Sequence, residues 1–283
     1  MPTLSTLFSS LAQSPAVANA LPTIGVILVA MAAIAIVEVL IPLHPRGRWS
    51  WEHLVPNLGL TLITFATNFV FNAALLAALI WTESVGFGIL HMTNFGLIAT
   101  IVIVVLALDF AFYVSHVAMH EIPGFWRYHR VHHSDPAVDV TTTIRQHPGE
   151  SVIRYTFLAF FAIAIGASPV AFAVYRAQSA LQGLLEHANV RLPVWVDTLL
   201  SFFITSPNMH KIHHARDARF TDRNFGNITS LWDRLFLTFV PAHLGQNIDY
   251  GLDGFDEKSQ QGLLGLIAMP YREPRIVAEE TAA

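Results

Sequence analysis

The chain has 283 residues, of which 53% are hydrophobic and only 13% are charged, whereas soluble domains carry roughly 25% charged residues. This composition indicates a protein that lies in a lipid bilayer. The net charge of -4 and the scattered Lys and Arg residues exclude the basic stripe of a nucleic-acid-binding protein. Cysteine is absent, which excludes disulfides, thiolate catalysis and cysteine-ligated iron-sulfur clusters, and leaves nitrogen and oxygen ligands for any metal.

The first half of the chain predicts three transmembrane helices. Residues 1–22 are rich in Ser, Ala and Pro and lack the positive n-region of a secretory signal, so we expect a loose N-terminal tail. Three apolar segments then follow that are each long enough for a spanning helix of about 20 residues, at 23–42, 54–81 and 95–119. We expect Glu38 at the membrane interface. The amides of the second segment should bond neighbouring helices rather than line a transport path; they belong to Asn57, Asn68 and Asn72.

A fourth apolar stretch, 152–187, is interrupted by Ser168 and Pro169. A continuous helix of this length would measure about 54 Å, well beyond one bilayer. We therefore predict a hairpin of two short or tilted helices. The expected fold class is an all-α integral membrane protein with about three full spans, this hairpin and a His-rich helical cap.

The charge of the connections predicts the orientation. The connection 82–94 has no Lys or Arg, whereas 43–53 and 120–154 contain Arg residues, so the positive-inside rule places the latter two in the cytoplasm. All the histidine motifs then fall on the cytoplasmic side of an inner or plasma membrane. The polar region 208–250 should fold there against the helix ends as the cap.

Histidine is the unusual residue of this chain, with 14 copies, five of them between residues 116 and 133. His116 and His120 are four apart, so both imidazoles lie on one helix face and can reach one metal ion. The motif His-x-x-His-His then occurs twice, at 129–133 and 210–214. His147 and His187 stand at the two ends of the apolar hairpin. The ten candidate metal ligands are His116, His120, His129, His132, His133, His147, His187, His210, His213 and His214.

One member of this set has an alternative role, and the other histidines of the chain lie outside the set. His147 is either a ligand or a loop histidine that caps the following helix. The remaining four histidines are expected to be ordinary surface or core residues; they are His44, His53, His91 and His243.

Eight to ten imidazoles exceed what one ion accepts, so the sequence predicts two metal ions. Imidazole suits zinc, copper, iron and nickel alike, and ligand type alone leaves the metal open. A site just beyond the helix ends is placed to meet the carbon chain of a membrane lipid. Hydrolytic two-metal sites usually include bridging carboxylates, and the motifs contain few, which favours redox chemistry on carbon.

Several stretches between residues 105 and 240 resemble the fatty acid hydroxylase superfamily, also called the sterol desaturase family. They read DFAFYVSHVAMHEIPGFWRYHRVHHSD, RQHPGE, HKIHHARD and NFGNITSLWDRLFLTF. The first of them is most similar to the alkylglycerol monooxygenase and bacterial sterol-desaturase-like branch. In that branch an acidic residue follows the first histidine motif; here it is Glu121, directly after His120. The chain departs from the fatty acid 2-hydroxylases in having one histidine, His187, where they typically have a pair.

The resemblance implies a membrane-bound non-haem di-iron enzyme that uses O₂ to hydroxylate or desaturate an unactivated C–H bond of a lipid. Zinc is a substitute occupant of such a site, and no catalytic residue beyond the metal ligands is expected. Electrons would come from a separate donor such as a ferredoxin, a cytochrome b5-like protein or a pterin. The hydroxylase domain would cover 23–250, followed by a C-terminal tail at 251–283. Candidates to orient the imidazoles are Asp109, Glu121, Glu150, Asn189 and Asp233.

Three other functions compete with this interpretation. A zinc-dependent lipid hydrolase would use the same ligands. A metal transporter should place ionisable residues at mid-bilayer, and the spans have almost none. A haem-based electron carrier normally has its histidines within the spans, whereas here they lie outside. The sequence leaves the lipid open among sterols, fatty acyl chains, ether lipids, carotenoids and alkanes.

Overall fold

The computed structural model describes residues 20–44 and 50–274. Within these residues every regular element is a helix, and extended backbone is limited to two isolated bridges. The predicted all-α membrane fold is therefore confirmed. Most of the predicted tail at 1–22, and two of the Arg residues used for the orientation, Arg46 and Arg48, lie outside the described residues.

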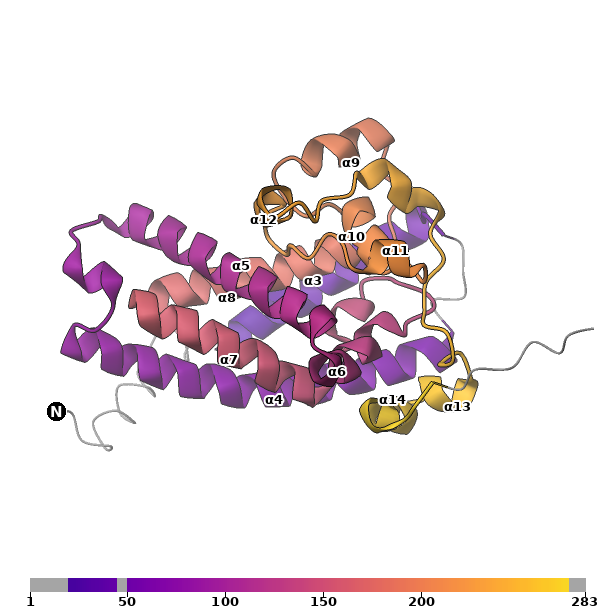
Figure 1. The fold of residues 1–283 in the computed structure, drawn as a ribbon, viewed down its shortest axis with the longest axis horizontal. Coiled ribbons are helices and arrows are strands. Elements are labelled where there is room, and N and C mark those ends of the chain that lie inside the picture. Colours follow the sequence, from indigo (N-terminus) through magenta and orange to yellow (C-terminus); the bar gives the residue numbers. More distant parts are fainter. Residues whose placement is uncertain (1–19, 45–49, 275–283) are drawn as a thin grey trace, which may run out of the picture.

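Five long helices form a bundle (Figure 1). The other elements gather at one end of it, except the short helix Ile89–Met92, which joins α4 to α5 at the opposite end. The bundle helices are α3 (Ala20–Leu40), α4 (Trp51–Val85), α5 (Leu97–Glu121), α7 (Pro148–Ile165) and α8 (Pro169–His187). Helix α5 packs on α7 and α8, α4 packs on α7, and α3 packs on α8. Four of the helices are long and apolar enough to cross a membrane, namely α3, α4, α5 and α7. Helix α4 would be about 52 Å long at 1.5 Å per residue, so it extends well beyond the bilayer core.

The hairpin of α7 and α8 turns at the predicted place. Gly166 ends α7 with a φ of 69°, a left-handed conformation that glycine adopts without strain. The Ser168 hydroxyl accepts a hydrogen bond from the Ala171 N–H, and Pro169 occupies the first turn of α8. These local features at Gly166, Ser168 and Pro169 therefore stop one helix and start the next.

Apolar side chains pack between α4, α5, α7 and α8 and hold the bundle together, among them Leu79, Leu108, Leu158 and Phe172. Other large apolar side chains on the same helices point outward, as expected for surfaces that face lipid. Phe160, for example, is 69% exposed.

The helices at this end of the bundle carry five of the chain's 14 histidines, three on α6 and two on α10. They are α6 (Pro123–His133), α9 (Val194–Leu200), α10 (Pro207–His213), α11 (Ala218–Thr221) and α12 (Leu231–Leu235). Short 3-10 helices lie at Ile89–Met92, Thr142–Ile144, Ala242–Asn247 and Met269–Tyr271. The buried Asp109 carboxylate of α5 anchors this cap, because it accepts hydrogen bonds from the Ile228 and Thr229 N–H groups and from the Trp232 indole. The cap therefore cannot shift relative to α5 without leaving a buried carboxylate unpaired.

The structure adds contacts for Glu38 and corrects one expectation. Glu38 lies in the last turn of α3 and is fully buried, and its carboxylate accepts the Val140 and Asn189 N–H groups. The described part of the predicted tail at 251–283 is not loose, since it forms α13 (Lys258–Gln261) and α14 (Leu263–Ala268), which pack on α4. Buried apolar side chains such as Leu266 explain this packing.

Candidate metal centre

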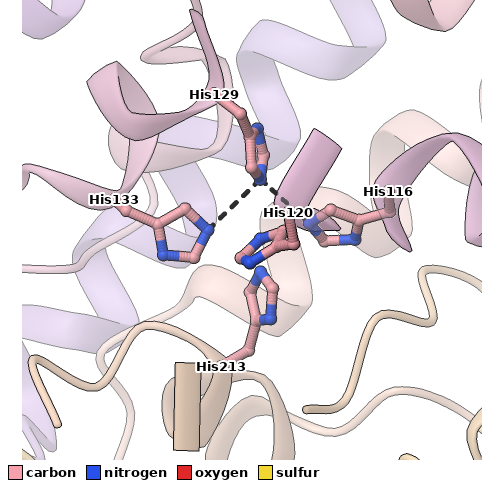
Figure 2. Close-up of side chains that lie close together, drawn as sticks. All are labelled: His116, His120, His129, His133 and His213. Atoms are coloured by element: carbon pink, nitrogen blue, oxygen red, sulfur yellow. Dashed lines mark hydrogen bonds between the residues drawn. The ribbon is translucent and has the colours of Figure 1, made fainter. Parts of the chain in front are cut away.

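Nine histidines converge in two adjacent buried groups at the junction of the bundle and the cap. The five-His cluster contains His116, His120, His129, His133 and His213, and its rings surround a common centre (Figure 2). The four-His cluster contains His132, His187, His210 and His214. Within each cluster one nitrogen from every ring lies within 4.8 Å of the others, so each cluster is able to hold a metal ion.

The two His-x-x-His-His motifs each contribute to both clusters. On α6, His129 and His133 are four apart and enter the five-His cluster, while His132 turns to the other cluster. On α10 the division is reversed, because the pair His210 and His214 enters the four-His cluster and His213 enters the five-His cluster. Residues four apart share a helix face, and the residue between them points to a neighbouring face. The repeated motif therefore lets two short helices each contribute histidines to both clusters.

The bundle supplies the remaining ligands. His116 and His120 come from the last turns of α5 and enter the five-His cluster, and His187 is the last residue of α8 and enters the four-His cluster. Each cluster thus joins spanning helices to the cap.

The distances between ring nitrogens match what a shared ion requires. The Nε2 atom of His129 lies 3.0 Å from Nε2 of His116 and 3.2 Å from Nε2 of His133. In the four-His cluster, Nε2 of His187 lies 3.0 Å from that of His132 and 3.1 Å from that of His210. Two nitrogens bound at about 2 Å to one tetrahedral ion are about 3.3 Å apart. The donor set therefore fits a metal ion.

In the five-His cluster, hydrogen bonds to the outer ring nitrogens hold three rings with Nε2 facing the centre. Nδ1 lies 2.8 Å from the Phe225 carbonyl in His116, 2.9 Å from an Asp222 carboxylate oxygen in His120, and 2.8 Å from the Arg223 carbonyl in His213. The Nε2 atoms of His120 and His213 are buried and have no hydrogen-bond partner. Such bonds fix the tautomer that leaves Nε2 free to bind a metal.

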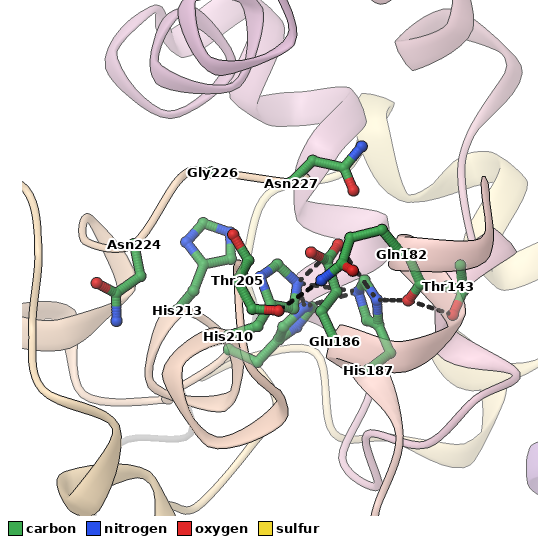
Figure 3. Close-up of polar contacts among 12 residues, drawn as sticks. Thr143, Gln182, Glu186, His187, Thr205, His210, His213, Asn224, Gly226 and Asn227 are labelled. Atoms are coloured by element: carbon green, nitrogen blue, oxygen red, sulfur yellow. Dashed lines mark hydrogen bonds and ion pairs between the residues drawn. The ribbon is translucent and has the colours of Figure 1, made fainter. Parts of the chain in front are cut away.

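The four-His cluster is less firmly held from outside. Only His187 has an outer bond, from Nδ1 to the Gly183 carbonyl at 2.7 Å, whereas the Nδ1 atoms of His132, His210 and His214 are buried without a partner. Instead a buried carboxylate stands beside this cluster. An oxygen of Glu186 lies 3.7 Å from Nδ1 of His187 and 3.8 Å from Nε2 of His210 (Figure 3).

Burial sets the protonation of the cap histidines. Removal from water, and then the charges of the other imidazoles, lower the pKa well below the usual value in His129, His132, His133, His210 and His214. Burial also lowers the pKa of His213, to about 4. These rings are neutral at pH 7, which is the form that binds a metal.

His147 does not join either cluster. Its Nδ1 accepts the Gly149 N–H at 2.9 Å, which makes it the N-cap of α7, and its Nε2 lies 3.2 Å from the Ile267 carbonyl. The prediction that it is a ligand is therefore not supported, and the alternative of a helix cap describes it. As expected, none of the other four histidines lies in a cluster; His53, for instance, is paired with Asp135 at 2.9 Å.

The candidates to orient the imidazoles have different roles from one another. Glu150 reaches an imidazole, at 3.3 Å from Nδ1 of His129. Asp233 acts one step further away, since it accepts the Phe225 and Gly226 N–H groups and so supports the carbonyl that holds His116. Asp109 anchors the cap, and Glu121 is exposed at the end of α5. The Asn189 side-chain amide donates a hydrogen bond to the His44 carbonyl.

Sequence reasoning missed two carboxylates beside the clusters. Glu186 directly precedes a ligand on α8, a signal that was present in the sequence. Asp222 lies 102 positions from His120, and only tertiary packing brings them together.

A cavity of about 290 Å³ connects the clusters to the interior of the bundle. Its histidine end is formed by His116, His129, His132, His187 and His210. Its other end reaches Ile24 of α3 and Leu76 of α4, and most of its lining is apolar. A hydrocarbon chain in this cavity would lie against the candidate metal centre.

The family model that describes the fatty acid hydroxylase domain matches residues 101–238. Relatives include an alkylglycerol monooxygenase from Caenorhabditis elegans, 31% identical over 51% of this chain and 28% of its own length. An ornithine lipid hydroxylase from Rhizobium tropici is 28% identical over 58% of this chain and 47% of its own length. A fatty acid hydroxylase from a Lecanicillium species is 30% identical over 46% of this chain and 39% of its own length.

The chain spans less than half the length of each of these relatives. No solved structure matches it. The matched region contains α6, α8, α10 and almost all of α5, and therefore all nine clustered histidines. On these grounds residues 101–238 of the chain belong to the fatty acid hydroxylase superfamily.

Proposed function

We propose that this protein is a membrane-bound, O₂-dependent lipid hydroxylase with two iron ions held by nine histidines. The observation that carries the proposal is the pair of buried imidazole clusters at the end of a largely apolar cavity. The names of its relatives, which include two lipid hydroxylases and a monooxygenase, support the reaction class. We further propose that the clusters face the cytoplasm and that a separate protein or pterin donates electrons.

When bound, the two irons would supply the chemistry that activates O₂ for insertion of one oxygen atom into a C–H bond, while the other atom leaves as water. The protein's own contribution is binding and orientation. The five-His and four-His clusters would each hold one ion, and the outer hydrogen bonds to the Phe225 and Arg223 carbonyls keep the rings aimed at it. The cavity walls would exclude water and hold the target carbon near the metals.

The test is to express the full chain in a lipid-containing host under heavy-isotope O₂ and to analyse the extracted lipids by mass spectrometry. A hydroxylase gives a lipid heavier by one oxygen atom, and that atom carries the isotope. The His132→Ala variant is the matched negative control, because it removes one ligand of the four-His cluster.

Other outcomes point to other reactions. A product lighter by two hydrogens would indicate desaturation by the same centre. A cleaved lipid with oxygen derived from water would instead favour a zinc hydrolase and would contradict the proposal.

A further inference from the structure

Two arginines line the apolar cavity below the histidine clusters. Arg154 lies on α7 and Arg176 on α8, on two helices that form the hairpin. Arg154 stacks over the Phe112 ring at 5.3 Å, and Arg176 stacks over the Tyr155 ring at 5.4 Å. Both also border a small adjoining cavity. The two guanidinium groups therefore belong to one region of the bundle.

Only one of these arginines has a carboxylate partner. Arg154 is paired with Glu150 at 3.3 Å, whereas Arg176 makes no ion pair with any residue in 20–44 or 50–274. The Nε atom of Arg176 is buried without a hydrogen-bond partner. One positive charge on the cavity wall is thus uncompensated by the described residues.

Helix α4 contributes further unused polar groups to the lining of this cavity. Asn68 and Asn72 of α4 line the same cavity, and the side-chain oxygen of each is buried without a hydrogen-bond partner. Ionisable groups inside a membrane bundle are costly unless they are paired, and they usually mark a substrate site. The Nε–H of Arg176 is a donor and would meet an acceptor of a ligand, whereas the two asparagine oxygens are acceptors and would meet a donor such as a hydroxyl or amide N–H of the same ligand.

We propose that the cavity takes a lipid with an anionic group, a carboxylate or a phosphate, which pairs with Arg176. This inference rests on the proposed function, because it names the substrate class of the same site. Guanidinium suits both anions, since it donates two parallel hydrogen bonds. The largely apolar remainder of the cavity would hold the hydrocarbon chain, and Glu150, which contacts both Arg154 and His129, links the arginine region to the candidate metal centre.

The test measures equilibrium binding to the full-length protein in a neutral detergent, without metal or O₂. The probes are isotope-labelled hexadecanoate and hexadecanol, and in a second arm a lysophosphatidate and a monoacylglycerol with the same chain. We expect the wild type to bind one of the acids at least about tenfold more tightly than its neutral partner, which corresponds to about 1.4 kcal/mol. The arm that shows the preference identifies the anion.

Substitutions test whether Arg176 causes the preference for the acid over its neutral partner. Arg176→Gln should bring the acid-to-neutral ratio close to one, and Arg176→Lys should retain part of it because the charge remains. The control is Arg219→Gln, which removes an equal charge from a side chain that is 81% exposed, and which should leave the ratio unchanged. A wild-type ratio near one in both arms, or an unchanged ratio in Arg176→Gln, would overturn the proposal.

The experiment also separates the two proposals. Binding does not require turnover, so a protein that selects acids and hydroxylates nothing would contradict only the hydroxylase proposal. A protein that hydroxylates neutral lipids without this selectivity would contradict only the anionic substrate.

Discussion

The two histidine clusters lie side by side but are built differently. The five-His cluster has more ligands, and carbonyl or carboxylate oxygens hold the outer nitrogens of His116, His120 and His213. The four-His cluster has fewer histidines and fewer outer bonds, and its neighbouring carboxylate, Glu186, lies 3.7–3.8 Å from two ring nitrogens. In the five-His cluster the Glu150 carboxylate lies closer, 3.3 Å from Nδ1 of His129. Three of the four histidines in the four-His cluster line the cavity, against two of five in the other cluster.

This difference indicates a division of roles. A metal site with its full set of ligands is closed, whereas a catalytic site keeps a position open. We therefore expect the five-His cluster to bind its ion more tightly and the four-His cluster to meet the substrate. The substitutions below test that contrast, from the largest expected effect to the smallest.

Loss of a ligand should have the largest effect. His132→Ala leaves three imidazoles in the four-His cluster, and His129→Ala leaves four in the other. We expect His132→Ala to lower the metal content from about two ions per chain to about one, as measured by elemental analysis of purified protein. His129→Ala should lose metal less completely.

The exposed His243 provides the matched control, since His243→Ala should retain both ions. If His132→Ala retained two ions, or if His129→Ala lost more metal than His132→Ala, the proposed contrast between the clusters would be wrong.

Asp233→Asn should weaken the five-His cluster selectively. The Asp233 carboxylate holds the Phe225 N–H at 2.7 Å, and the Phe225 carbonyl orients His116. Loss of such support typically lowers metal affinity about 10- to 100-fold. Burial raises the pKa of Asp233 to about 6, so the titration belongs at pH 8, where the native group is charged.

The control for this substitution is Asp253→Asn, at a carboxylate that is 87% exposed. Equal weakening of both metal sites by Asp233→Asn would show general loosening of the cap instead of a local effect.

Glu186→Gln tests the carboxylate beside the four-His cluster. Because Glu186 lies 3.7 Å from Nδ1 of His187 and 3.8 Å from Nε2 of His210, we expect about tenfold weaker metal binding there, at the lower end of such effects, and no change in the five-His cluster. Glu83→Gln, on the exposed end of α4, is the control. A metal titration that finds both affinities unchanged would remove Glu186 from the site.

His147→Ala should have the smallest effect. The substitution removes the side chain that accepts the Gly149 N–H at the start of α7, so we expect a loss of about 1 kcal/mol in stability and full metal content. Thermal unfolding and elemental analysis measure the two quantities separately. Loss of one ion at unchanged stability would instead identify His147 as a ligand.

Local patterns in the sequence were sufficient for the long helices of the bundle and for most of the site. Apolar segment length predicted the spanning helices, Ser168 and Pro169 predicted the break between α7 and α8, and four-residue spacing predicted the shared face of His116 and His120. These features depend on neighbours within one or two helical turns, where backbone geometry is the same in any fold.

Tertiary structure alone decided how the parts combine. It divided each His-x-x-His-His motif between two clusters, brought Asp222 to His120, and turned His147 away to cap α7. It also left Arg176 on a cavity wall without an ionic partner among the described residues. Spacing along a helix determines which side chains share a face, but only the packing of distant helices determines what that face meets.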